Sequence, residues 1–245
     1  MARVCVDSTF FDVDSNGNLT FKRTSVGLQQ LVPFTTPGTF NFSKASFPGL
    51  TRLRVRVIGG GGGAGGTKVP APDAATVGTG GGGGGYSESI ISAASLGATE
   101  TITVGAGGVG GVGNAAGTAG GQSSFGGFVI ANGGLGSPAG VDNDSTGFNG
   151  FTYAFGGYGA TPGTGQIAAP GGNSTTGDIT TDFTSAAGLG GNAGGGYGAG
   201  GSIGFVGSPG TGYGGGGGGS GRNQGFGAGT GGNGAPGAVF LDLYY

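Results

Sequence analysis

The chain has no histidine and only one cysteine, Cys5. Without histidine it cannot build Ser-His-Asp or Cys-His catalytic sites, or metal sites with histidine ligands. A single cysteine cannot form a disulfide within the chain. Charged side chains are also scarce, at 8% of residues. Disordered chains usually combine low hydrophobicity with high net charge, so this scarcity argues against disorder.

Long hydrophobic runs are missing as well. The long uncharged stretch 183–221 consists mostly of glycine, alanine and serine and lacks the large aliphatic side chains of a membrane span. The segment Met1–Asp7 lacks the apolar core of a signal peptide. We therefore expect no membrane insertion.

The few charges are unevenly distributed. Eight of the nine Lys and Arg residues, but only three of the eleven acids, lie at or before Lys68, which gives residues 1–68 a net charge of +5. The rest of the chain carries Arg222 and eight acids, a net charge of −7. Such a surface is a poor candidate for binding nucleic acid by neutralising its many phosphates, so we expect no nucleic-acid partner.

Glycine occupies 71 of the 245 positions, and all but four of them lie beyond Ile58. Such a chain is either disordered or held by backbone contacts that only glycine permits. Collagen is excluded, because glycine is irregularly spaced and there are only 10 prolines. We predict extended helices of the polyglycine II type, bonded to one another through their backbones. Runs such as Gly214–Gly219 would be inner rods, and segments such as Gly156–Ala160 would face outward on one side.

Segments with β character bracket the glycine. Thr39–Phe42 and Arg52–Ile58 alternate between polar and apolar residues, and Tyr86–Ile91 and Glu100–Val104 are predicted strands. The C-terminal run Ala238–Tyr245 is expected to return to the sheet that contains Arg52–Ile58. The predicted fold is mainly β with little or no α-helix: a small antiparallel base and a polyglycine-type region with loops at the rod ends. The base comprises residues 33–58, 86–104 and 235–245, and the loops are Gln122–Asn132, Val141–Phe155, Gln166–Ala187 and Ser202–Tyr213.

Residues 1–32 are predicted to be a separate β-hairpin that serves for attachment, followed by a glycine-rich domain over residues 33–245. Asn16-Gly17 between two apolar runs is a strong hairpin signal, because both residues tolerate positive φ. The same stretch imitates the opening of an EF-hand loop. That loop needs a glutamate at its twelfth position, which here holds Arg23, so the hairpin is favoured over a calcium site.

The alternation in 52–58 places Arg52, Arg54 and Arg56 on one face of the strand. The simpler interpretation is a solvated face. The alternative is that the three cations meet acidic groups of a partner chain, which makes them candidates for an oligomer interface.

Several motifs match by chance. Gly60, Gly62 and Gly65 match a dinucleotide fingerprint, but no amphipathic helix follows. The pairs Asp142/Asp144 and Asp178/Asp182 could in principle bind calcium or flank a glycosidic bond. Loop aspartates more often satisfy turns. We therefore predict no enzyme activity, no metal and no cofactor.

Aromatic and polar residues crowd into one part of the chain. Aromatic faces with polar neighbours suit the recognition of sugars or proteins. The alternative is that these rings plug the sides or ends of the bundle. The candidate recognition residues are Asn143, Asp144, Phe148, Asn149, Phe151, Tyr153, Phe155 and Tyr158.

The order of the sequence blocks resembles the glycine-rich domain of minor tail proteins and tail fibres of tailed bacteriophages. The resemblance covers roughly residues 33–245. The blocks that carry it are Thr36–Phe42, Leu53–Gly63, Gly82–Glu88, Thr101–Gly108, Gln122–Gly126 and Gly234–Phe240.

This resemblance implies a virion protein at the tail tip or at the end of a fibre, commonly a homotrimer. Its partners would be other tail proteins and a glycan or protein of the host cell surface. Unlike long fibres, the chain has no coiled coil or shaft repeat before the domain, so residues 1–32 would make the attachment. A receptor-binding adhesin and a purely structural cap both remain open, and a depolymerase built on the aspartate pairs is the least favoured alternative.

Overall fold

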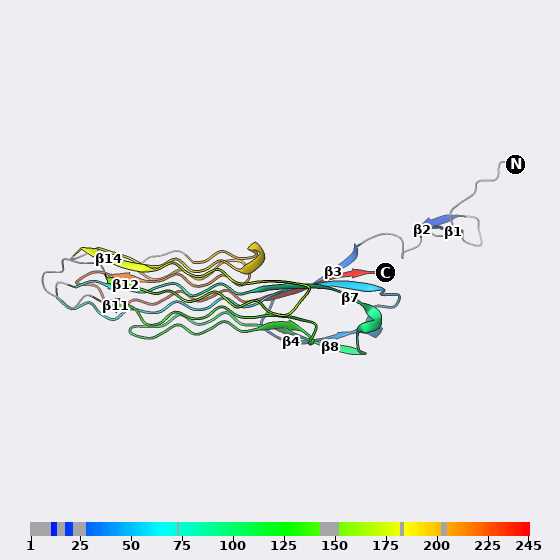
Figure 1. The fold of residues 1–245 in the computed structure, drawn as a ribbon, viewed down its shortest axis with the longest axis horizontal. Coiled ribbons are helices and arrows are strands. Elements are labelled where there is room, and N and C mark those ends of the chain that lie inside the picture. Colours follow the sequence, from blue (N-terminus) through cyan, green and yellow to red (C-terminus); the bar gives the residue numbers. More distant parts are fainter. Residues whose placement is uncertain are drawn as a thin grey trace.

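The structure is a computed structural model that describes residues 11–13, 18–21, 28–72, 74–142, 152–181, 184–201 and 205–245. The described part is mainly β, with three short 3-10 turns and no longer helix. Figure 1 shows an elongated body with strands at one end and a bundle of wavy, extended segments beyond them. The strands are β1 (Phe11–Val13), β2 (Leu19–Phe21), β3 (Leu28–Phe34), β4 (Gly38–Ser43), β5 (Arg52–Ile58), β6 (Thr76–Val77), β7 (Tyr86–Ser92), β8 (Thr99–Val104), β9 (Ser123–Phe125), β10 (Val129–Ala131), β11 (Val141–Asp142), β12 (Thr152–Ala154), β13 (Ile167–Ala169), β14 (Gly177–Thr181), β15 (Thr184–Ala186), β16 (Gly221–Arg222) and β17 (Ala238–Tyr244). The turns are η2 (Lys44–Ser46), η3 (Ala93–Ser95) and η4 (Gly194–Gly196).

Two antiparallel sheets form the base. One has the strand order β13-β7-β5-β17-β3 and the other β10-β9-β8-β4. The predicted return of the C-terminal strand is confirmed, since β17 pairs with β5 from Ala238 opposite Ile58 to Tyr244 opposite Arg52. The predicted alternation of β5 is also confirmed, because Leu53, Val55 and Val57 are fully buried and the arginines lie on the other face.

A hydrophobic core lies between the two sheets. Phe42, Ile102 and Phe125 of the four-stranded sheet pack against aliphatic residues of β5 and β17. The rings of Phe42 and Phe125 meet edge to face, with centroids 5.7 Å apart. Burying one such side chain contributes about 1.5–3 kcal/mol, so these residues make the base the conventionally stabilised part of the fold.

Strands of the base continue directly into the glycine segments, and β5 runs into residues 59–66. The backbone bonds of this segment repeat every three residues, as expected for a helix with three residues per turn. Every third amide donates to the same neighbour, at 2.8–3.3 Å: residues 59, 62 and 65 to segment 79–85, residues 60, 63 and 66 to segment 115–121, and residues 61, 64 and 67 to segment 229–235.

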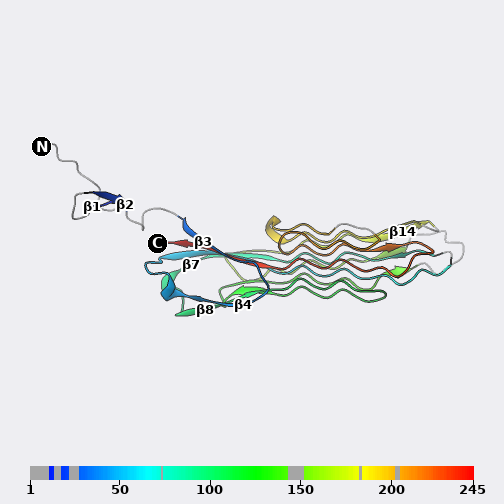
Figure 2. The ribbon, with the colours of Figure 1, turned by 180° about the vertical axis from the view of Figure 1, so that it is seen from behind.

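The described glycine-rich residues form three inner segments surrounded by a ring of nine outer ones. The inner segments bond to one another, and each outer segment bonds to both of its neighbours in the ring and to the inside. Figures 1 and 2 show these segments running side by side along the long axis. The inner segments are 59–66, 78–85 and 214–220; the outer ones are, in ring order, 105–111, 115–121, 132–140, 155–160, 170–175, 188–194, 198–201, 207–211 and 229–236.

The inner positions need glycine because the neighbouring backbones approach so closely. A Cβ atom on Gly61 would lie 2.1 Å from the carbonyl oxygen of Gly215, and one on Gly82 would lie 1.9 Å from that of Tyr158. No described glycine of segments 59–66 and 78–85 has a positive φ. Glycine serves in these two segments because it has no side chain; in the third inner segment only Gly214, at its start, has a positive φ. The predicted polyglycine II-like packing is confirmed, including the inner position of Gly214–Gly219.

Most outer segments expose every third residue, and segments 115–121 and 170–175 expose two residues in three. Ala106 and Val109 point outward from one segment, and Leu135 and Pro138 from another. Where the third residue is polar, its side chain bonds to the next segment. The side-chain oxygens of Asn173, Asn192 and Asn233 accept from the amides of Gly159, Gly200 and Gly110 at 2.8–2.9 Å. Such side chains satisfy amides that have no backbone partner at the surface of the bundle.

Four boundaries differ from the sequence-based expectation, one of them because the expected loop 166–187 contains β13 of the base and the outer rod 170–175. β3 crosses the expected boundary at residue 33, because residues 28–34 pair with β17 and thus belong to the base. The stretch 122–132 contains β9 and β10 of the base sheet, and 207–211 is an outer rod. The predicted N-terminal hairpin is present as the antiparallel pair of β1 and β2, while its Asn16-Gly17 turn lies outside the described residues.

Candidate functional site

Every second connection between rods lies at the end of the bundle opposite the base, which we call the distal end (Figures 1 and 2). Hydrogen bonds fix this arrangement: the amide of Gly78 donates to Ser220 and that of Gly188 donates to Gly78. Segments that are far apart in the sequence therefore reverse direction at the same distance from the base. The described parts of these connections are 67–72, 74–77, 112–114, 141–142, 152–154, 176–181, 184–187, 205–206 and 221–228.

Two small sheets and a second core order the distal end. The sheets have the orders β11-β6-β16 and β12-β14-β15. Val77 and Ile179 are fully buried and pack with Ala75, Ala154 and Ala187. The described strands at this end thus rest on a packed core, and a rigid scaffold of this kind is the usual support for binding residues.

The carboxylates at this end do not form a catalytic pair among the described residues. Asp142 makes an ion pair with Lys68. Asp178 lies in β14, half-buried, and its sequence partner Asp182 and the Asp144 partner of Asp142 lie outside the described residues. The described residues contain no group of three or more His, Cys, Asp or Glu side chains that could hold a metal ion.

Most of the predicted recognition residues lie outside the described part of the chain: Asn143, Asp144, Phe148, Asn149 and Phe151. The backbone of Tyr153 lies in β12, and its side chain is outside the description. Phe155 and Tyr158 are 73% and 65% exposed, so these two rings do not fill the bundle. They lie on one outer segment, where they are available to a partner.

An aromatic pair that the sequence analysis passed over lies at the distal end. Phe205 and Phe226 stack with ring centroids 5.0 Å apart, and both remain about half exposed. The guanidinium carbon of Arg222 lies 5.6 Å from the centroid of the Phe205 ring. The available signal was Arg222 itself, the one cation beyond Lys68.

The arginine face of β5 is paired within the chain. Arg54 and Glu88 form a bidentate pair at 2.6 and 3.0 Å, and Arg56 contacts Asp242 at 2.9 Å. Arg52 is exposed and lies over the Tyr244 ring, 5.1 Å from its centroid. Two of the three interface candidates therefore have acidic partners of their own, and their role in an oligomer interface stays a prediction.

This pairing shifts the ionisation of the neighbouring groups. The hydrogen bond from Arg54 lowers the pKa of Glu88, against the opposing effect of burial. Burial and the hydrogen bond to Glu88 raise the pKa of Tyr86. Burial lowers the pKa of Arg56, but hydrogen bonds to Tyr197 and Asp242 outweigh it and leave that pKa raised. The network thus favours charged arginine and carboxylate with a neutral tyrosine, which suits a structural junction.

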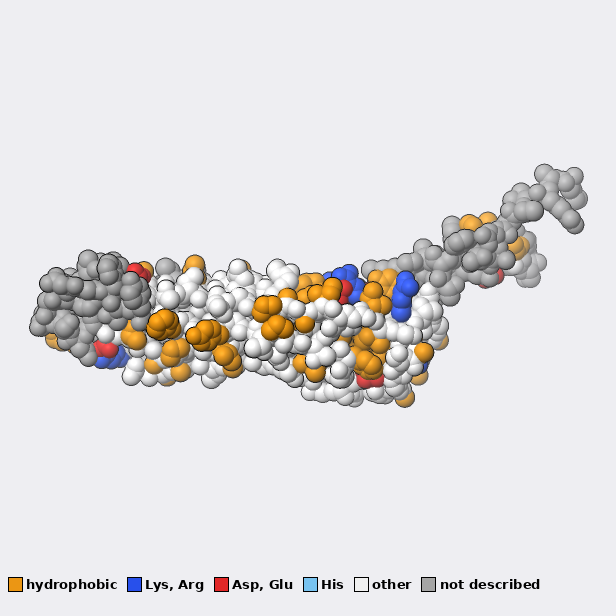
Figure 3. Space-filling model, in the orientation of Figure 1, with side chains coloured by type: hydrophobic (Ala, Val, Ile, Leu, Met, Phe, Trp, Pro, Cys, Tyr) orange, Lys and Arg blue, Asp and Glu red, His pale blue; other side chains and the backbone are white. Residues whose placement is uncertain are grey.

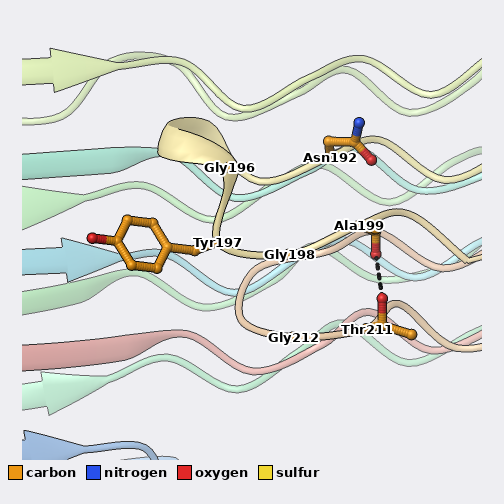
Figure 4. Close-up of a pocket in the computed structure, with 7 residues that line it drawn as sticks. All are labelled: Asn192, Gly196, Tyr197, Gly198, Ala199, Thr211 and Gly212. Carbon is orange, nitrogen blue, oxygen red and sulfur yellow. Dashed lines mark hydrogen bonds between the residues drawn. The ribbon is translucent and has the colours of Figure 1, made fainter.

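An open groove of about 320 Å³ lies where the bundle meets this network (Figure 4). Asn192, Ala199 and Thr211 lie on one side of it, and the ring of Tyr197 points away from them toward the strands. Tyr197 stacks on Tyr86 at 5.4 Å and is bonded to Arg56, so its ring belongs to the junction. The groove has no charged lining residue, and we assign it no function.

Figure 3 shows the charge distribution on one face of the molecule. Charged side chains lie near the two ends, and hydrophobic groups lie along the flank between them. No helix among the described residues has the length and apolar character needed to cross a membrane.

Comparison with known proteins agrees with this architecture. A family model described as a glycine-rich domain matches residues 35–244. A comparison with curated proteins finds no match to the chain. The matched range begins within the base and extends through the whole bundle to β17, nearly to the last residue. The chain therefore belongs to the family of glycine-rich domains.

Proposed function

We propose that the protein is a bacteriophage tail protein, a minor tail protein or fibre tip, whose distal end recognises the surface of the host cell. One observation carries the proposal: six segments that connect rods meet at the end of the bundle far from the base, on a small packed core. The glycine rods form a rigid scaffold, and the residues between the glycine runs supply the side chains that bind the ligand. This division is common where a rigid framework presents binding loops.

The base is the expected site of attachment to other tail proteins, in the virion. It carries the C-terminal strand β17 and, through β3, the connection to the β1–β2 hairpin. A homotrimer is part of the proposal and rests on the resemblance to tail fibres. The activity proposed is binding, to a glycan or protein of the host, with no enzymatic step.

A purely structural role in the tail is the second candidate. Exposed aliphatic side chains on the flank of the bundle favour it, because they suit lateral packing against a neighbouring protein. These residues are Val109, Val112, Leu135 and Leu189.

Adsorption to cells separates the two candidates. The purified chain is incubated with bacteria on which the phage grows, and the bound fraction is measured with and without excess unlabelled protein. Saturable binding that also delays adsorption of the phage supports the recognition role. Absence of binding, together with loss of tail assembly when the gene is deleted, would replace it with the structural role.

A further inference from the structure

We infer that the distal surface formed by Phe205, Phe226 and Arg222 binds a saccharide that carries a carboxylate or a phosphate group. We call this surface the aromatic–arginine surface. The inference deepens the proposed host recognition, on which it rests, by naming a site and a ligand class.

The aromatic rings provide the first part of the site. Phe205 is 53% exposed and Phe226 47% exposed, although each covers part of the other in the stacked pair. Phe226 also lines an open groove of about 460 Å³. The other lining residues are Val69, Pro70, Pro72, Gln224, Gly225 and Gly227. Exposed ring faces beside a mostly apolar groove with one amide side chain suit the apolar face of a sugar ring.

Arg222 provides the second part. It is the only Lys or Arg in the last 177 residues. Among the described residues it has no acidic partner: it lies over Phe205, and its Nη2 donates to the carbonyl oxygen of Ala228 at 3.3 Å. Its Nε is buried and has no hydrogen-bond acceptor. A guanidinium has five N–H donors and is always charged. The donors of Arg222 that are not hydrogen-bonded within the chain therefore suit an anionic group of a ligand.

The nearest acid of the same small sheet does not neutralise Arg222. Asp142 and Arg222 both lie opposite Thr76, on its two sides. Two strand spacings amount to about 10 Å, roughly the screening length at physiological salt. Asp142 is moreover paired with Lys68. The positive charge of Arg222 therefore acts locally on a ligand held at the rings, in spite of the negative charge of the chain as a whole.

The test uses two matched pairs of immobilised polysaccharides. Polygalacturonate is compared with its methyl ester, and phosphomannan with the same mannan after dephosphorylation. We expect the protein to bind at least one acidic polysaccharide about tenfold more tightly than its neutral counterpart, the effect of one charge-assisted contact. Equal binding of both members of each pair, or no binding to any of the four, would overturn the inference.

Substitutions place the site. Arg222→Gln should abolish the preference for the acidic form, and Phe226→Ala should weaken binding to both forms. Lys44→Gln and Phe128→Ala are the controls, a cation and an exposed phenyl group at the base, and should leave binding unchanged. Melting temperatures of all variants show whether each is folded. A preference that persists in folded Arg222→Gln would contradict the assignment.

The same variants separate this inference from the proposed function. If the wild-type chain prefers the acidic polysaccharide but does not adsorb to susceptible cells, the site stands and the recognition role fails. If Arg222→Gln adsorbs to cells as well as the wild type does, the recognition role stands and this site fails.

Discussion

The amide of Gly217 donates to the carbonyl oxygen of Gly62 at 2.9 Å, and the amide of Gly62 donates to that of Gly82 at 2.8 Å. These residues belong to the three inner segments, of which 214–220 is far from the other two in the sequence. The bonds require the backbones to lie closer than any side chain would permit. The scaffold is thus held by hydrogen bonds between remote glycine runs, while the hydrophobic cores lie at its two ends.

Substitution of an inner glycine should destabilise the protein strongly. A Cβ atom on Gly216 would lie 2.1 Å from the carbonyl oxygen of Gly81, and a backbone atom cannot move aside as the end of a side chain can. We expect Gly216→Ala to cost about 3 kcal/mol of unfolding free energy or more, and Gly216→Val still more. Urea denaturation measures the loss. Gly127→Ala is the control, because a Cβ atom there meets nothing within 4 Å. Near-normal stability of Gly216→Ala would contradict the packing.

The asparagine bonds of the outer ring make a smaller and additive contribution. The side chain of Asn233 accepts from the amide of Gly110 at 2.8 Å, and replacement by alanine leaves that amide to water. We expect Asn233→Ala to lower the unfolding free energy by about 1 kcal/mol, and the corresponding change at Asn192 to add to it. Val109→Ala, at an exposed outer position without such a bond, should stay within about 0.5 kcal/mol. Identical stabilities of Asn233→Ala and Val109→Ala would refute this role.

The Glu88 carboxylate should make stability depend on pH. Its pKa is lowered in the folded state by the hydrogen bond from Arg54, so its contribution is complete above the unfolded pKa of about 4.3. The contribution is lost as the pH falls from there through the folded pKa. We expect Glu88→Gln to flatten the acid limb of a plot of urea midpoint against pH. Arg52→Gln removes an exposed charge from the same face and should keep the slope; an unchanged slope in Glu88→Gln would count against the pair.

Part of this architecture could be predicted from the sequence, because it depends on local patterns. The alternation in 52–58 identified the buried face of β5, and uninterrupted glycine at 214–219 identified an inner rod. The outer rods also carry a local signal in the sequence. Glycine looked irregular along the whole chain, yet within most outer rods the exposed residue recurs every third position, as in Leu135 and Pro138.

The rest depends on which remote segments are neighbours. The pairing of Arg54 with Glu88 needs the register of β5 against β7, in which Arg56, and not Arg54, lies directly opposite Glu88. Phe205 lies close to Phe226 and Arg222 because the connections that follow two separate rods lie at the same distance from the base. A hydrogen bond between two glycine backbones involves no side chain. The sequence therefore does not indicate which segment a given glycine run bonds to.

Amide hydrogen exchange tests the central claim, that the inner glycine segments form a hydrogen-bonded bundle, most directly. The amides of 59–66, 78–85 and 214–220 should be protected as strongly as those of the base strand β5, because opening them requires the bundle to come apart. Gly225 and Gly227, where a side chain would meet nothing within 4 Å, serve as exposed controls and should exchange quickly. Strong protection of the inner segments is the result that the account predicts. Exchange of these segments at the intrinsic rate of an unstructured chain would contradict it.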